Sequence, residues 1–205
     1  ALCKYLAHHP SALPDGARIE LGAGLGMCGI AVAKLDHARG ANYPVVCTDG
    51  IPSLIPYIEA NALANGVSLR AAHLLWGDTA ATQALLRRLD RCQPGAVLGA
   101  DIIYQLDAIP ALVATIVQLD PKVALLAARL RDHEVRDALA EHTRLAGWCV
   151  EELQRGWGEQ NWDTVILFSL EKRGPVVKEV AHNAVSQQSG PRQHLCGIDQ
   201  SRTGR

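Results

Sequence analysis

The sequence contains no long hydrophobic run and no excess of charge of either sign. Its longest apolar stretches, such as residues 108–119, are interrupted by Pro110, Thr115 and Gln118, and none approaches the roughly 20 residues that a membrane helix needs. The 205 residues carry a formal net charge of -1, so no basic excess points to nucleic acid. The sequence therefore predicts neither a membrane nor a nucleic-acid partner.

Clustered metal-ligand and disulfide patterns are missing as well. The six cysteines stand singly without a CxxC pair, and the eight histidines include no HExxH motif. We interpret the cysteines as reduced thiols in a protein of the cytoplasm, with the nucleus as the alternative compartment. No secretory signal is visible, and a monomer is the default expectation.

Segments with extended and helical apolar patterns alternate through most of the chain. The pattern predicts strands over residues 18–21, 44–49, 68–75, 96–100, 122–128, 148–153 and 164–170. It predicts helices over residues 1–9, 26–39, 52–65, 82–89, 107–119 and 132–146, with Asp107 as a cap. This alternation implies a Rossmann-like, doubly wound α/β fold with a seven-stranded sheet, mostly parallel with an antiparallel last strand. We expect one domain over residues 1–173 and a disordered tail over residues 174–205.

Three glycines, Gly22, Gly24 and Gly26, lie between the first strand and the helix that follows it. In open parallel sheets, ligands bind beyond the carboxyl ends of the strands, where glycines let the backbone approach a ligand. Residues 24–29 satisfy the GxGxxG dinucleotide pattern, and Asp49 ends the second strand, where a ribose hydroxyl would be held. NAD binding is therefore one interpretation of this loop.

Glu20, which precedes the glycines, favours a different ligand. A carboxylate at this point would repel a pyrophosphate, but it suits a cofactor with a cationic sulfonium, an amino group and no phosphate. The loop is therefore better interpreted as a site for a nucleoside joined to an amino acid. A tight turn that binds nothing is the remaining alternative.

The segment E-L-G-A-G-L-G-M-C-G over residues 20–29 resembles the first motif of the seven-stranded class I S-adenosylmethionine-dependent methyltransferases. Further motifs follow in order: Thr48-Asp49, N-A-L-A-N-G over residues 61–66, L-W-G-D over residues 75–78 and G-A-D-I-I-Y over residues 99–104. Together they are similar to the protein-lysine methyltransferase family that includes the chaperone and elongation-factor lysine methyltransferases, over residues 1–171. The resemblance implies an N-methyltransferase that uses S-adenosylmethionine to modify a lysine side chain of a protein substrate.

The resemblance also implies a cofactor site built from the residues that follow four strand ends: Glu20, Gly22, Ala23, Gly24, Gly26, Asp49, Trp76 and Ala100. Asp49 would hold the ribose hydroxyls, Trp76 would lie against the adenine, and Ala100 would touch the cofactor beside the methyl group. From the residues alone, Trp76 is equally suited to stacking on a purine and to packing in the core. Family members usually carry a tryptophan before the first helix, so the resemblance implies an N-terminal truncation at Ala1.

Asp101 and Tyr104 follow the fourth strand and are the candidate catalytic residues. A lysine amine must lose its proton before it attacks, because its reference pKa lies near 10.4. Asp101 would orient the incoming ammonium and accept its proton, and Tyr104 would narrow the channel or accept a hydrogen bond. The alternatives are a capping role for Asp101 and simple packing for Tyr104.

Trp157 and Trp162 lie between the last two strands and suit either an aromatic wall for a lysine stem or packing. Two other functions stay open at this point. The enzyme would then act on a small-molecule amine or another protein side chain, or the fold would bind its cofactor without turnover.

Overall fold

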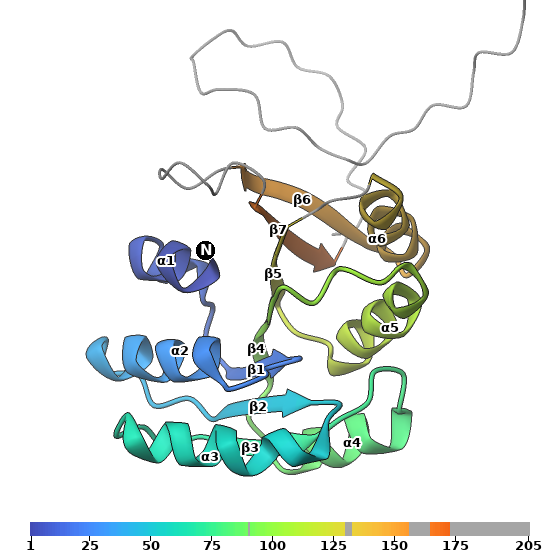
Figure 1. Ribbon diagram of the computed structural model, residues 1–205. Coiled ribbons are helices and arrows are strands. Elements are labelled where there is room, and N and C mark those ends of the chain that lie inside the picture. Colours follow the sequence, from blue (N-terminus) through green and yellow to red (C-terminus); the bar gives the residue numbers. More distant parts are fainter. Residues whose placement is uncertain (90, 130–132, 156–164, 173–205) are drawn as a thin grey trace, which may run out of the picture.

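A computed structural model describes residues 1–89, 91–129, 133–155 and 165–172 (Figure 1). Seven strands form one sheet in the order β3-β2-β1-β4-β5-β7-β6. The strands are β1 (Ala17–Leu21), β2 (Val45–Asp49), β3 (Arg70–His73), β4 (Pro94–Ala100), β5 (Val123–Arg129), β6 (Trp148–Arg155) and β7 (Val165–Lys172). Strands β1 to β5 pair in parallel, and β7 is antiparallel to both β5 and β6. The predicted fold class, including the antiparallel last strand, is confirmed.

Helices cover both faces of the sheet, as Figure 1 shows. One face carries α1 (Leu2–His8), α2 (Met27–Ala38) and α3 (Ile55–Ala64), which bury Leu6, Val32 and Ile58. The other face carries α4 (Thr79–Arg87), α5 (Ile109–Leu119) and α6 (His133–Leu145). Short 3-10 turns η1 (Pro10–Ala12), η2 (Pro52–Leu54) and η3 (Leu106–Ala108) precede β1, α3 and α5. Because apolar side chains are buried on both faces of the sheet, the central strands have apolar residues along most of their length.

Several element boundaries differ from the prediction. Helix α4 begins three residues earlier than predicted, because Asp78 Oδ1 accepts a hydrogen bond from the N–H of Ala81 (2.9 Å) and caps the helix. Strand β3 is shorter because the chain leaves the sheet after His73 and turns at Leu75, whose carbonyl accepts from the N–H of Asp78 (3.1 Å). The prediction of Asp107 as a cap is wrong, since this residue lies inside η3 and no side chain caps α5.

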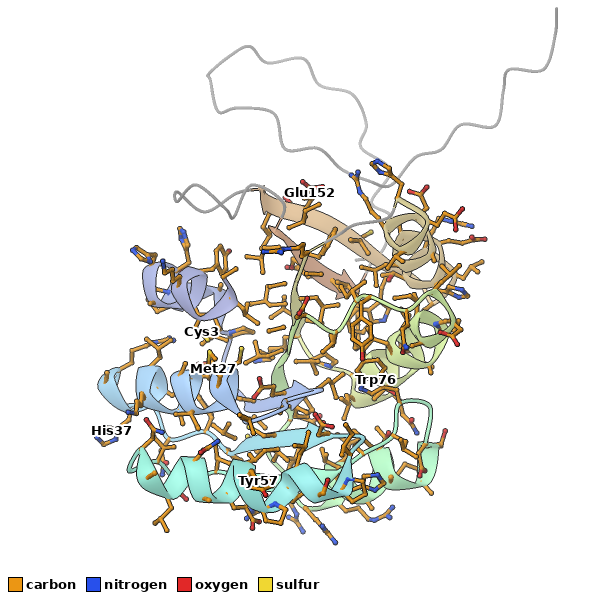
Figure 2. All side chains as sticks on the ribbon, in the orientation of Figure 1. Cys3, Met27, His37, Tyr57, Trp76 and Glu152 are labelled. Carbon is orange, nitrogen blue, oxygen red and sulfur yellow. The ribbon has the colours of Figure 1, made fainter. Side chains whose placement is uncertain are left out.

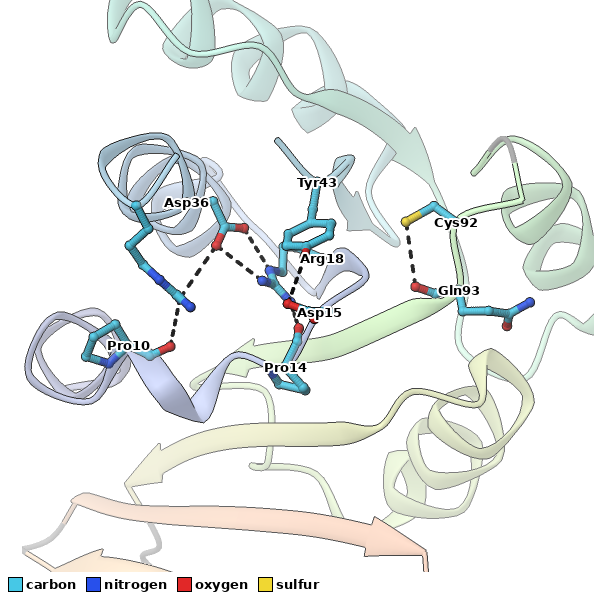
Figure 3. A network of polar contacts seen from close by, with 9 residues as sticks. Pro10, Pro14, Asp15, Arg18, Asp36, Tyr43, Cys92 and Gln93 are labelled. Atoms are coloured by element: carbon cyan, nitrogen blue, oxygen red, sulfur yellow. Dashed lines mark hydrogen bonds and ion pairs between the residues drawn. The ribbon is translucent and has the colours of Figure 1, made fainter. Parts of the chain in front are cut away.

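A buried ion pair ties the amino-terminal end of β1 to α2 (Figure 3). Arg18 is 1% exposed, and its Nε and Nη2 donate to Oδ2 and Oδ1 of Asp36 at 2.8 and 3.2 Å. Nη1 of Arg18 donates to the carbonyl of Pro14, and the Tyr43 ring covers the guanidinium at 4.8 Å. Two hydrogen bonds in parallel satisfy a charge that burial would otherwise make costly. This pair lies at the opposite end of β1 from Glu20.

The predicted tail over residues 174–205, and Trp157 and Trp162, lie outside the described residues. Within the described part of the chain, no helix is long and apolar enough to cross a membrane. The same residues contain no group of three or more His, Cys, Asp or Glu side chains that would hold a metal ion.

Candidate cofactor and catalytic site

The parallel strands bring the predicted site residues to one edge of the sheet. Glu20 is in register with Cys47 of β2 and with Leu98 of β4, so β1, β2 and β4 end side by side. The glycine loop, Asp49, Trp76 and the segment from Ala100 therefore all follow neighbouring strand ends. This is the edge at which open α/β sheets bind their ligands.

Left-handed glycines shape the loop between β1 and α2. Gly22, Gly24 and Gly26 have φ values of 59°, 56° and 83°, a region that only glycine enters at little cost. A Cβ on Gly22 would lie 2.6 Å from Cγ2 of Ile102, and one on Gly26 would lie 3.0 Å from Cγ2 of Ile58. A Cβ on Gly24, by contrast, would meet nothing within 4 Å. Open space therefore faces the middle of the loop.

Asp49 ties this loop to the end of β2. Its Oδ2 accepts from the N–H of Gly24 (2.8 Å), and its Oδ1 accepts from the N–H of Ile51 (2.9 Å). Each oxygen keeps a second lone pair, because a carboxylate accepts about four hydrogen bonds in total. Ala23, which is 8% exposed, donates its N–H to the carbonyl of Thr48 (2.9 Å) on the same strand. The loop and the end of β2 thus form one rigid unit with a carboxylate at its rim.

Glu20 lies beneath the loop, where it is 3% exposed. Its Oε1 accepts from the N–H of Cys28 (3.3 Å), and its Oε2 accepts from the N–H of Gly29 (2.8 Å) and from the Cys47 thiol (3.3 Å). Burial raises the pKa of this carboxyl, and the hydrogen bonds from Gly29 and Cys47 oppose that rise. Glu20 therefore supports the loop from inside the protein.

This placement bears on the choice between the two cofactor classes. A dinucleotide pyrophosphate uses the free N–H groups at the start of the helix that follows the glycines. Here the N–H groups of Cys28 and Gly29, in the first turn of α2, already hold the Glu20 carboxylate. A second anion in the same place would meet both an occupied donor set and a negative charge.

Trp76 is half-buried, packs against the main core, and reaches the glycine loop (Figure 2). A Cβ on Gly22 would lie 3.4 Å from its Cζ2 atom. The residue that follows, Gly77, has a φ of 85°, which turns the chain away toward α4. The ring thus combines core packing on one side with a place beside the glycine loop.

Asp101 and Tyr104 lie on the opposite side of the loop from Asp49, after the half-buried Ala100 at the end of β4. Asp101 is exposed and has a φ of 59°, which is strained for a residue with a Cβ. Its N–H donates to the carbonyl of Ala127 (2.7 Å) on β5, which holds the strained backbone in place. Tyr104 is 65% exposed. A backbone in this conformation persists only where neighbouring contacts hold it.

Two contacts that shape the site were not anticipated from the sequence. Asn61 of α3 donates through Nδ2 to the carbonyl of Leu25 (3.0 Å), and so holds the outer part of the glycine loop. Ile102 fills the space beside Gly22 and is 5% exposed. Asn61 belongs to the N-A-L-A-N-G motif, so the sequence marked the residue but did not predict its contact with Leu25.

A pair of thiols lies next to Glu20. Cys3 of α1 and Cys28 of α2 place their Sγ atoms 3.6 Å apart, within hydrogen-bonding distance for sulfur. The hydrogen bond from Cys28 lowers the pKa of the half-buried Cys3 to about 7, although burial opposes the shift. The same hydrogen bond and burial raise the pKa of Cys28. We therefore expect Cys3, and not Cys28, to be the thiol that ionises near neutral pH.

We expect the rate at which iodoacetamide alkylates Cys3 to increase with pH, because the thiolate is the reacting form. The midpoint of this pH dependence should lie near 7. Cys28, which is 4% exposed, should stay unmodified over the same range. Mass spectrometry of the peptides after timed alkylation at each pH measures both. A Cys28→Ala variant should move the Cys3 midpoint upward, and an unchanged midpoint in that variant would disprove this origin of the shift.

The chain is similar in sequence to known methyltransferases. The sequence model of a family described as lysine methyltransferase matches residues 1–139. The chain is 34% identical over 140 residues to protein N-lysine methyltransferase METTL21A of Danio rerio, covering 63% of this chain and 57% of that protein. It is 30% identical over 162 residues to protein-lysine N-methyltransferase EFM3 of Chaetomium thermophilum, covering 73% of this chain and 46% of that protein. The chain thus spans about half the length of these relatives.

The fold recurs in solved structures. Magnesium protoporphyrin IX methyltransferase from Synechocystis PCC 6803, solved with bound SAM, superposes with a TM-score of 0.57 at 14% identity. The superposition covers 84% of this chain and 76% of the other. At this level of identity the likeness concerns the arrangement of helices and strands.

Proposed function

The chain belongs to the lysine methyltransferase family, and we propose that it is an S-adenosylmethionine-dependent protein-lysine N-methyltransferase. The relatives METTL21A and EFM3 are named as protein-lysine methyltransferases. The observation that carries the proposal in this chain is the placement of Glu20. Its carboxylate occupies the helix N–H groups that a pyrophosphate needs, which leaves a site suited to a nucleoside cofactor without phosphate.

The residues around the glycine loop fit such a cofactor. The free lone pairs of Asp49 suit the two ribose hydroxyls, and the open space above Gly24 admits a ligand close to the backbone. Trp76 offers a flat aromatic ring to the adenine. In this proposal Glu20 acts as a positioning residue, since it orients the start of α2 from below.

S-adenosylmethionine, when bound, supplies a methyl group on a cationic sulfonium, and the transfer is an in-line displacement. The work of the chain is therefore to align the lysine amine and to remove its proton. Asp101 presents an exposed carboxylate beside Ala100, where it attracts the lysine ammonium and accepts its proton. Tyr104 narrows the approach, so that the amine nitrogen arrives with its lone pair toward the methyl group.

Calorimetric titration with S-adenosylmethionine, NAD and NADP in parallel tests the cofactor. We expect saturable binding of S-adenosylmethionine alone, because Glu20 excludes a pyrophosphate from α2. Binding of either dinucleotide would instead contradict the proposal. Transfer of a radiolabelled methyl group to lysate proteins, followed by hydrolysis, then identifies the modified amino acid. If the label is found on a residue other than lysine, the enzyme methylates a different nucleophile.

An Asp101→Asn variant separates catalysis from binding. Asparagine tolerates the left-handed backbone at this position, so the fold should be retained. We expect methyl transfer to fall about 100-fold, because the proton acceptor is lost, while cofactor affinity stays near that of the parent. Single-turnover transfer and calorimetry measure the two quantities. Tyr104→Phe should lower transfer less, and full activity in both variants would show that the reacting centre lies elsewhere.

A further inference from the structure

A buried hydroxyl attaches the loop that carries Trp76 to α5. Thr115, which is fully buried in the middle of α5, accepts a hydrogen bond from the N–H of Gly77 through its Oγ1 (2.8 Å). The same hydroxyl donates to the carbonyl of Ala111 (2.8 Å), so its hydrogen is engaged and a lone pair is left for Gly77. Gln118 adds a second tie, from its Nε2 to the carbonyl of Thr79 (3.2 Å).

This attachment lies next to Trp76 in the chain. Gly77 has a left-handed φ of 85°, and a Cβ on it would lie 3.5 Å from the Cβ of Ala111, so the turn rests directly on α5. Trp76 immediately precedes the turn and brings its Cζ2 atom to the edge of Gly22. The Gly77 attachment therefore holds the backbone from which the indole extends beside the glycine loop.

We propose that Thr115 is a positioning residue for the cofactor, which it serves by fixing the Trp76–Gly77 turn. This inference rests on the proposed function, in which Trp76 lies against the adenine. Thr115 itself touches no ligand, because it is fully buried beneath the turn. Its effect is to keep the indole in one orientation before the cofactor arrives, so that binding does not have to order the loop.

Helix α5 also follows the segment that carries Asp101 and Tyr104. That segment passes through η3 into α5, whose first residue, Ile109, is 1% exposed and anchored in the main core. One rigid helix therefore holds the catalytic segment at its start and the Trp76 turn at its middle. The Thr115 hydroxyl thereby sets the position of the adenine side of the site relative to the methyl-transfer side.

Thr115→Val tests the proposal, because valine keeps the shape of threonine and removes the oxygen. We expect the Kd for S-adenosylmethionine to rise roughly fivefold, equivalent to about 1 kcal/mol, and the Gly77 amide to exchange its hydrogen faster. Thr115→Ser keeps the hydroxyl and should restore both quantities. Calorimetry gives the Kd, and NMR-detected hydrogen exchange follows Gly77 with and without cofactor.

Thr143→Val is the matched control. Thr143 of α6 is also buried, at 1% exposed, but its Oγ1 has no hydrogen-bond partner among the described residues. The same change there should leave the Kd unaltered and should not lower stability, because it removes an unsatisfied buried hydroxyl. A loss of affinity in both valine variants would point to a general effect of altered packing and would overturn the proposal.

The outcomes separate this inference from the proposed function. If the parent binds no S-adenosylmethionine, the proposed function fails. If the parent binds it and Thr115→Val changes the Kd by less than about twofold, the positioning role fails and the function stands. Fast exchange of the Gly77 amide in the parent would also overturn the positioning role, and this measurement needs no variant to fold. Thr115→Ala, which likewise lacks the oxygen, replaces the valine variant if that one does not fold.

Discussion

Replacing Arg18 by methionine is expected to lower the free energy of unfolding by about 3–5 kcal/mol, because it leaves the Asp36 carboxylate buried without its main partner. Asp36 is 2% exposed and accepts two hydrogen bonds from Arg18. The same change also removes the bond from Arg18 to the carbonyl of Pro14. Equilibrium unfolding in urea, followed by circular dichroism, gives the difference between variant and parent.

Arg39→Met is the control for this change. Arg39 approaches the same carboxylate at 3.8 Å, but its side chain is 37% exposed, so its loss should cost under about 1 kcal/mol. The double variant Arg18→Met/Asp36→Leu should recover most of the loss, since no charge is then left buried. Equal losses of unfolding free energy in Arg18→Met and Arg39→Met would show that burial of the Arg18–Asp36 pair is not the cause.

Replacing Gly24 by alanine is expected to weaken binding of S-adenosylmethionine on the order of a hundredfold, about 2.7 kcal/mol. The new methyl group would meet no protein atom within 4 Å and would project into the open space that the proposed function assigns to the cofactor. The left-handed φ of 56° adds a cost of about 1–2 kcal/mol to stability. Calorimetry and urea unfolding measure the two effects separately.

Gly66→Ala provides the matched comparison. Gly66 follows α3, has a φ of 66°, and likewise has nothing within 4 Å of a Cβ. It should therefore lose about the same stability as Gly24→Ala, about 1–2 kcal/mol, without any change in cofactor affinity. If Gly24→Ala binds as tightly as Gly66→Ala does, the cofactor does not lie over the glycine loop.

The fold was predictable because its signals are local and repeated. Most strands contain a short apolar run, as in β2, β4 and β5, and glycines or prolines mark many of the turns, so the order and type of the elements follow from the sequence. The boundaries were less accessible, because they depend on single contacts. Asp78 extends α4 toward its start through one cap, and the Leu75–Asp78 turn shortens β3. Such contacts join residues whose spacing does not reveal which partner each will choose.

The gathering of the candidate site residues at one edge of the sheet was predictable from the sequence, and the contacts beneath them were not. Asp49, Trp76 and Asp101 follow strand ends, and parallel strands must bring such positions together. The inward direction of Glu20 could not be inferred, since a residue at a strand end can point toward the ligand or toward α2. Thr115 lies 38 residues from its partner Gly77, and its hydroxyl has no motif of its own. Supporting contacts of this kind depend on packing between layers.

The place of β7 in the sheet sets an order for folding during synthesis. β5 pairs with β4 on one side and with β7 on the other, while β6 pairs with β7 alone. The N–H and C=O groups along the free side of β5 therefore stay unpaired until β7, the last of the seven strands, has been synthesised. Until residues 165–172 emerge, the nascent chain carries an apolar open edge, the kind of surface to which other unfinished chains attach. The open edge is covered once β7 pairs with β5, and β6 joins the sheet only through β7.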